Sequence, residues 1–192
     1  MGIRFLHSVC VFLLLSVGAH AGEPSTRTRR PTDPPDLRQI TQRAGMIFLG
    51  RVETISWKHA PGGGPSDRVR ITFKILDGIR GARTGDSLEV QEWSGLWVPG
   101  NERYQVGETL MLFLYPRSRL GLTSPVGGDA GRIEITPTQR VVLSPERTST
   151  LLPRSLRLQK QQMTLETVRG ARSAYYEQFS RIVRELAGGS PP

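Results

Sequence analysis

Few side chains in this sequence are able to act as a nucleophile, a general base or a metal ligand. Cys10 is the only cysteine, and two of the three histidines, His7 and His20, share its apolar N-terminal segment. This leaves His59, beside a glycine-rich stretch, as the only histidine in the rest of the chain. Zinc sites are built mainly from clustered histidine and cysteine. No metal site and no cofactor are therefore expected, and cysteine catalysis is excluded from the remainder of the chain.

Ser87 is the candidate nucleophile. Gly85-Asp86-Ser87-Leu88 matches the nucleophile motif of one esterase family, but serine chemistry also needs a base within hydrogen-bond reach. No histidine follows His59, so we interpret the motif as a turn that leads into a strand. Glu89 and Glu92 point to opposite faces if both lie in one strand, so they do not form an acid–base pair. No catalytic residue is assigned.

A loop with aromatic and basic residues is the first candidate binding surface. It follows a predicted strand and contains Trp93, Trp97, Arg103 and Tyr104. Tryptophan, tyrosine and arginine are the residue types that anchor protein interfaces. Two interpretations remain open at this stage: these aromatic side chains either contact a partner or cover the end of a β-barrel.

A second candidate surface contains Arg117 and Arg119, in a loop after the most apolar predicted strand. OB-fold barrels bind ligands through strand faces and adjoining loops. Nucleic-acid sites pair such cations with stacking aromatic side chains. An exported protein rarely meets nucleic acid, so a nucleic-acid partner is not expected.

The positive charge is carried almost entirely by arginine. The chain has 26 basic and 17 acidic residues, for a formal charge of +9. Only Lys58, Lys74 and Lys160 are lysines. Polyanion binding explains this composition, and so does a GC-rich genome that encodes arginine freely. Because the arginines are scattered along the whole sequence, composition alone favours the second explanation.

The N-terminus predicts export. Arg4 precedes an apolar run, and the small residues Ala19 and Ala21 suit a signal peptide over residues 1–21 that is cleaved before Gly22. The run is too short for a stable membrane span. Residues 22–35, which are polar and proline-rich, predict a flexible leader. The sequence therefore indicates a secreted or periplasmic protein with no membrane span after cleavage.

The central part of the chain predicts a small β domain over residues 36–143. Asp36 and Gln39 suit a capping box for a helix from Leu37 to Ala44. Apolar alternation is strictest over 69–75 and predicts a strand with a cationic outer face. The predicted strands cover residues 46–57, 69–75, 87–93, 109–115 and 120–123, followed by a terminal hairpin at 132–135 and 140–143. A bend is expected at Gly50, since glycine in a strand often marks a bulge, and residues 78–81 are expected to form a turn. Closing these strands into a five-stranded OB-like barrel removes exposed sheet edges.

The C-terminal part predicts a connector and a helix. Residues 144–162 contain Pro145 and Pro153 and indicate an irregular connector. Apolar residues at helical spacing then predict an amphipathic helix over 163–188, starting near Thr164 and ending near Gly188, with a short tail at 189–192.

The order of three segments resembles a known domain. These segments are 44–52 (AGMIFLGRV), 69–81 (VRITFKILDGIRG) and 104–115 (YQVGETLMLFLY). Together they resemble the netrin-like domain of tissue inhibitors of metalloproteinases and of bacterial relatives, over roughly residues 37–124. The resemblance implies an OB fold and extracellular protein binding. Inhibitory members use an N-terminal cysteine, whereas the predicted mature terminus is Gly22, so no inhibitory residue is transferred.

Three functions follow from these observations. The first is an exported, non-catalytic binding protein whose partner is an extracytoplasmic protein, with a protease as one option. The second is an arginine-rich, polyanion-binding envelope protein. The third is a hydrolase that uses Ser87 or a carboxylate pair.

Overall fold

A computed structural model describes residues 34–58, 68–97, 102–153, 156, 162–168 and 170–188, which belong to one compact unit, Pro34–Pro192. The predicted signal peptide, most of the predicted leader and the predicted tail lie outside the described residues. His59 and the glycine-rich loop that follows it also lie outside them.

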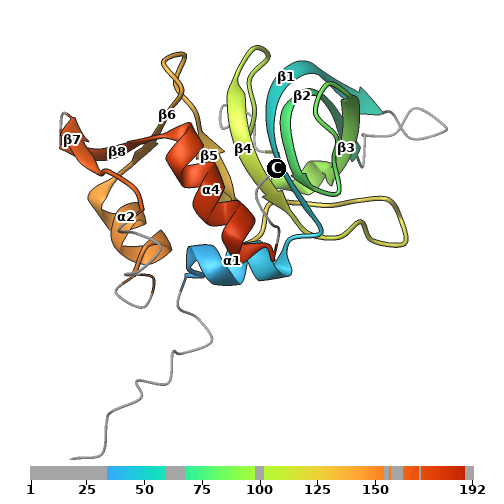
Figure 1. Cartoon of the computed structure of the whole chain (residues 1–192). Helices are drawn as coiled ribbons and strands as arrows, with labels where there is room; N and C mark the ends of the chain where they lie inside the picture. The colour runs from blue at the N-terminus through green and yellow to red at the C-terminus, as the bar shows by residue number, and fades with distance from the viewer. Residues whose placement is uncertain are drawn as a thin grey trace, which may run out of the picture. The chain divides into compact units, whose positions relative to one another are not determined.

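The described residues form two antiparallel sheets and three α-helices, which confirms the prediction of a mainly β protein. The first sheet has the strand order β3-β2-β1-β4-β5 and the second the order β6-β8-β7 (Figure 1). The strands are β1 (Met46–Lys58), β2 (Arg68–Arg80), β3 (Ser87–Trp93), β4 (Thr109–Leu114), β5 (Arg132–Glu134), β6 (Arg140–Leu143), β7 (Glu166–Val168) and β8 (Ala171–Tyr175). The helices are α1 (Leu37–Arg43), α2 (Pro145–Leu151) and α4 (Tyr176–Leu186), with short 3-10 helices η1 (Ser94–Leu96) and η2 (Gly128–Gly131).

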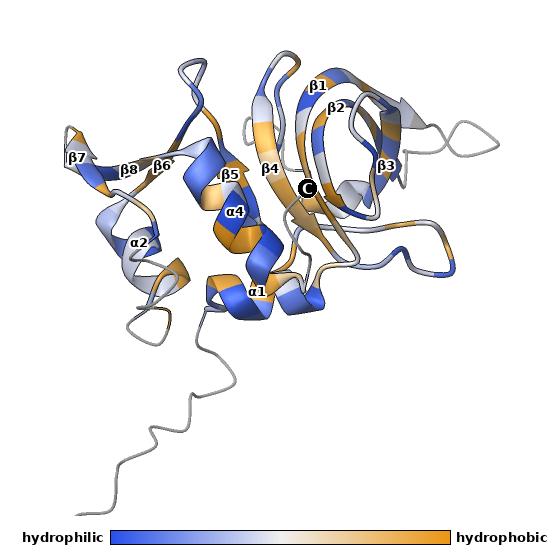
Figure 2. Ribbon diagram, in the orientation of Figure 1, coloured by the Kyte–Doolittle hydropathy of each residue, from blue (hydrophilic) through white to orange (hydrophobic). Residues whose placement is uncertain are grey.

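The alternation predicted for β2 is confirmed, and it gives the first sheet two unlike faces. Val69, Ile71 and Phe73 are buried on what we call the inner face, whereas Arg70 and Lys74 are only half-buried on the outer face. Because β2 pairs with both β1 and β3, these strands continue the same two faces. Figure 2 shows the alternation of hydrophobic and hydrophilic residues along β1 and β2.

β4 separates two hydrophobic cores, as its continuous apolar sequence predicts. Leu110 and Leu112 pack into the core beneath the inner face, together with Phe73. Met111 and Phe113 pack into a second core that the helices cover. β4 is accordingly hydrophobic along nearly its whole length in Figure 2.

The bend predicted at Gly50 is present as a β-bulge. The pairing of β1 with β2 shifts between Leu49 and Gly50. A Cβ at Gly50 would lie 2.9 Å from the ring of Phe48, so only glycine lets this ring cover the bulge. β1 bends here while it pairs with both β2 and β4 (Figure 1).

A closed barrel is not found, and the predicted strand at Leu120–Thr123 is wrong. β3 and β5 are the two ends of the first sheet. The segment between β4 and β5 instead reaches the edge of β3, where the Thr123 backbone N–H donates to the carbonyl of Gln91 at 2.9 Å. Gly121 adopts a positive φ of 77° there, in a turn that replaces the extended backbone of a strand.

The predicted hairpin is wrong in its pairing. Arg132–Ile135 and Arg140–Leu143 do contain strands, but β5 joins the first sheet and β6 the second. Only an isolated bridge between Ile135 and Val141 connects them. The tight turn before Arg140, in which Gln139 has a positive φ of 56°, directs the chain into the second sheet.

The predicted connector and C-terminal helix are partly wrong. Residues 145–151 form α2, with Ser144 as N-cap and proline at the first helical position, where a missing N–H costs nothing. Residues 166–168 and 171–175 form the paired strands β7 and β8 in place of a helix. Gly170 has a positive φ of 81°, which suits a turn, and among the described residues of the predicted helix only Tyr176–Leu186 is helical.

Helices α1 and α4 pack on the first sheet through two charged residues of β2. Asp36 and Gln39 form the predicted capping box of α1. The guanidinium of Arg80 donates to the Thr41, Ala44 and Ala187 carbonyls at 2.7, 3.0 and 2.8 Å, and so caps the C-terminal ends of both helices. Because β2 continues to Arg80, the turn predicted at residues 78–81 is largely strand.

Asp77 of β2 contacts α4. The Tyr176 hydroxyl donates to Asp77 at 2.7 Å, and Arg184 forms an ion pair with the same carboxylate.

Candidate binding site

The structure divides the predicted binding residues between the two faces of the first sheet. Trp97, Arg103 and Tyr104 meet at the inner face, around the side chain of Glu92. The remaining predicted residues, Trp93, Arg117 and Arg119, lie on or beside the outer face and are exposed. The single aromatic surface predicted from residues 93–104 is therefore two surfaces.

Glu92 is the centre of the inner group. It follows Leu88 and Val90 on the inner face of β3 and is 0% exposed. The indole N–H of Trp97 donates to Glu92 Oε2 at 3.2 Å, and the hydroxyl of Tyr104 donates to Oε1 at 2.8 Å. The Nε of Arg103 lies 3.1 Å from Oε2 and completes an ion pair. A buried carboxylate is tolerated when it is paired and hydrogen-bonded in this way.

Burial changes the acid–base behaviour of this group. Loss of solvent raises the pKa of Glu92, and the positive charge of Arg103 opposes the rise. The pKa of Tyr104 is raised well above its ordinary value, first by burial and second by the adjacent charge of Glu92. Tyr104 therefore stays a protonated hydrogen-bond donor, which holds its ring in a fixed orientation.

Trp57 extends this cluster to the surface. Its ring meets the buried Trp97 ring edge-on, with centroids 5.8 Å apart, and it remains 47% exposed. Trp97 in turn contacts Tyr104, with centroids 5.7 Å apart. Such edge-to-face contacts stabilise aromatic clusters beyond their buried area. Trp57 is thus an exposed aromatic side chain on a rigid support.

A groove opens beside this cluster. Its volume is about 480 Å³, and we call it the aromatic groove. It is lined by Ile55, Trp57, Trp97, Glu102, Tyr104, Gln105 and Val106. Its floor is apolar and aromatic, Glu102 and Gln105 supply polar groups, and Val106 is exposed at its rim. This composition is typical of binding sites, which combine apolar area with a few polar groups.

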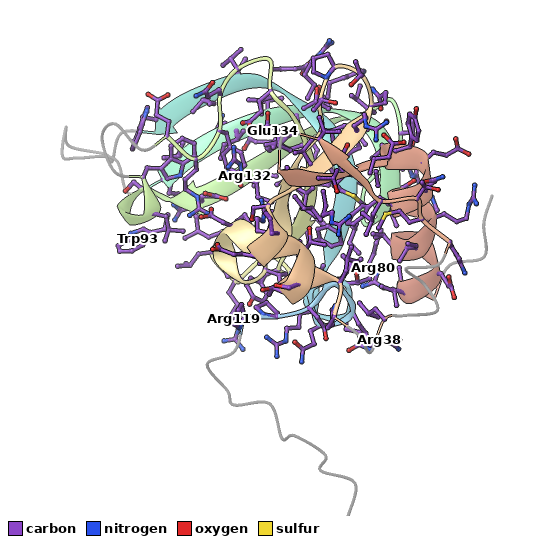
Figure 3. The ribbon with its side chains drawn as sticks, turned by 90° about the vertical axis from the view of Figure 1, so that its left-hand side faces the viewer. Arg38, Arg80, Trp93, Arg119, Arg132 and Glu134 are labelled. Carbon is purple, nitrogen blue, oxygen red and sulfur yellow. The ribbon has the colours of Figure 1, made fainter. Side chains whose placement is uncertain are left out.

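The outer face has the opposite chemistry. We call the side chains of Arg68, Arg70, Lys74, Trp93, Arg117 and Arg119 the cationic face. Arg68 lies opposite Trp93 in the register of β2 and β3. Its guanidinium donates to the Leu120 carbonyl at 3.2 Å, while Arg117 donates to the backbone carbonyl of Glu89 at 2.7 Å. These two bonds hold the loop after β4 beside the outer face, and Figure 3 shows Trp93 and Arg119 projecting from the molecule.

The described residues offer few groups for catalysis. The hydroxyl of Ser87 donates to Glu53 Oε2 at 3.0 Å, and all three histidines of the chain lie outside the described part. Within that part, no group of three histidine, cysteine, aspartate or glutamate side chains is placed to hold a metal ion. The helices of the same part are all too short or too polar to cross a membrane.

Sequence reasoning missed two residues that organise the site. The sequence places Glu92 on the face of its strand opposite Glu89, but does not show it as the partner of Trp97 and Tyr104. The sequence feature that could have indicated its role is a charged residue at an inward position of an apolar strand, because such a charge needs buried partners. Trp57 is predicted to lie in a strand, with no role assigned to it. Its position near the end of β1 is the feature that could have indicated an exposed ring.

Comparison with known proteins gives no family for this chain. None of the protein-family models matches the sequence, and no match is found among curated proteins. Functional conclusions therefore depend on the geometry of the two faces.

Proposed function

We propose that this chain is an exported, non-catalytic binding protein with a netrin-like OB fold, which holds a protein partner in the aromatic groove. The observation that carries the proposal is the exposed Trp57 ring, which rests on the buried Trp97–Glu92 pair. A tryptophan that is already ordered loses little conformational freedom when a partner covers it. Tryptophan and tyrosine also contribute most to binding energy at protein interfaces.

The sheet supports the OB-like part of the proposal. An OB fold is a five-stranded, partly open Greek-key barrel. The first sheet has five strands, and β1 pairs with both β2 and β4. Its free edge at β3 receives a hydrogen bond from Thr123, in the segment that follows β4. This contact joins the segment after β4 to β3 without a continuous strand pairing.

The non-catalytic part rests on the composition of the groove. Glu92, the carboxylate beneath it, is fully buried and is occupied by Trp97, Arg103 and Tyr104. It therefore serves to orient the aromatic side chains. The remaining lining residues are aliphatic, aromatic, amide or exposed carboxylate groups, which suits recognition of a partner.

A capture experiment tests this proposal. The immobilised protein is exposed to the secreted and envelope fraction of its host at high salt, and retained proteins are identified by mass spectrometry. Trp57→Ala should lose the retained partner, with a drop in affinity of about 30-fold, the effect of removing a 2 kcal/mol anchor. Trp93→Ala is the matched control, since Trp93 is equally prominent but lies on the outer face.

Three outcomes contradict the proposal. One is that no protein is retained at high salt. Another is that Trp93→Ala loses the partner while Trp57→Ala keeps it, which places the interface on the other face. The third is that the purified protein turns over a substrate and Ser87→Ala abolishes this activity, which indicates the hydrolase.

A further inference from the structure

The cationic face combines an ordered row of positive charge with one exposed aromatic ring. Arg68, Arg70 and Lys74 alternate along β2, so neighbouring cations of an i, i+2 pair lie about 7 Å apart along the strand. Trp93 is 56% exposed at one end of this row. Arg119 is exposed on the adjoining loop.

Part of the positive charge on this face has no carboxylate partner among the described residues. Lys74 and Arg117 donate to backbone carbonyls, which carry no net charge, and Arg119 is exposed. Arg70 forms an ion pair with Glu89 at 3.2 Å. Glu53 accepts a hydrogen bond from Ser87. Lys74, Arg117 and Arg119 therefore leave an excess of positive charge on this face, which favours an anionic ligand.

The glycine in η1 holds the aromatic ring in place. A Cβ at Gly95 would lie 2.4–2.6 Å from the Trp93 ring atoms. The indole therefore lies against the backbone of η1, and it is still 56% exposed. An exposed ring held against the backbone is suited to stacking on a flat or ring-shaped ligand.

We propose that the cationic face is a second binding site, separate from the aromatic groove, and that it takes a sulfated polysaccharide. Guanidinium groups bind tetrahedral oxyanions such as sulfate through two parallel hydrogen bonds. The negative face of an indole attracts the C–H groups of a sugar ring. Single-stranded nucleic acid uses several aromatic side chains for successive bases, whereas Trp93 is the one tryptophan of this face. The ligand is a linear chain, because the cations follow a strand.

Binding of a heparin octasaccharide to the full chain tests the proposal. Calorimetry at several salt concentrations gives the affinity. We expect Arg70→Gln/Arg119→Gln to weaken binding by about 10-fold or more, since two charge-assisted contacts are lost. Trp93→Ala should also weaken binding by about 10-fold, the effect of one stacking contact. Thermal unfolding of each variant checks that the fold is kept.

A matched control separates this site from general charge. Arg38→Gln/Arg181→Gln removes the same formal charge from exposed positions on α1 and α4. This variant and Trp57→Ala should each change the affinity by less than about 2-fold, because neither touches the outer face. The proposed aromatic groove is tested separately through its protein partner, so either site can fail alone.

Specific results overturn the proposal. Equal losses in Arg70→Gln/Arg119→Gln and in Arg38→Gln/Arg181→Gln indicate nonspecific charge. Tighter binding of a thymidine oligonucleotide of the same charge, with loss in Trp93→Ala, assigns the face to nucleic acid. An equal loss of heparin binding in Trp57→Ala shows that the two sites are one.

Discussion

The two faces of β3 place the same amino acid in opposite environments. Glu92 is fully buried on the inner face and bonds to Trp97, Tyr104 and Arg103. Glu89, three residues earlier, lies on the outer face, where its side chain is 43% exposed and pairs with Arg70. The period of two along a strand is enough to give one glutamate a structural role and leave the other in solvent.

The two faces also differ in how much their polar contacts contribute to stability. On the inner face, removal of water strengthens each polar contact and makes an unpaired group costly. On the outer face, solvent and salt screen the Arg70–Glu89 pair, so it adds little stability. The inner face therefore holds the aromatic groove rigid, and the outer face keeps its charge available to a ligand.

The largest expected effect comes from removing the buried carboxylate. Glu92→Ala leaves Arg103 and the donors of Trp97 and Tyr104 without their partner, and should destabilise the fold by about 3–5 kcal/mol. Glu89→Ala, the matched change on the outer face, should cost less than about 1 kcal/mol. Urea unfolding of both variants measures the difference. Similar losses in the two variants would show that burial does not distinguish the two glutamates.

A smaller effect is expected in the pH dependence of stability. Burial raises the pKa of Glu92 above its ordinary value of 4.5, so the folded chain binds this proton more tightly than the unfolded chain. The resulting stabilisation is complete below about pH 4.5 and is lost as pH rises through the folded-state pKa, by at most about 1.4 kcal/mol per pH unit. Glu92→Gln should remove this slope. The free energy of unfolding of both proteins is measured from pH 4 to pH 7. An unchanged slope in Glu92→Gln would assign the pH dependence of stability to other groups.

The smallest expected effect is on the outer face. Gly95→Ala forces the Trp93 ring to move, because the new Cβ would overlap it. Since Trp93 is exposed, stability should change by only about 0.5 kcal/mol, while heparin affinity falls toward that of Trp93→Ala. Thermal unfolding and calorimetry measure the two quantities. Unchanged heparin affinity would show that the position of this ring does not matter to binding.

Local patterns predicted the elements whose neighbours lie close in sequence. Alternation predicted β2 and placed Glu89 and Glu92 on opposite faces, and the Asp36–Gln39 box predicted the start of α1. The bulge at Gly50 also followed from its place inside an apolar strand. In these places, propensity, pattern and final structure agree.

Contacts between distant segments were not predictable in the same way. The helical spacing of apolar residues after Thr164 was real from Tyr176 onward, but Gly170 allows a turn that forms β7–β8 instead. The predicted hairpin failed because β5 pairs with β4, which precedes it by a long loop. The partners of Glu92 similarly come from outside its strand, where periodicity gives no information.

The indole N–H signals of the three tryptophans show directly whether the two faces of the first sheet bind ligands separately. A two-dimensional nitrogen–proton spectrum of the labelled protein gives one indole signal each for Trp57, Trp93 and Trp97. On titration with heparin octasaccharide, we expect a shift of the Trp93 signal alone. We also expect slow hydrogen exchange for Trp97, whose N–H is held by the buried Glu92. Movement of the Trp57 and Trp97 signals with heparin, while Trp93 stays unchanged, would show that heparin binds the inner face and not the cationic face.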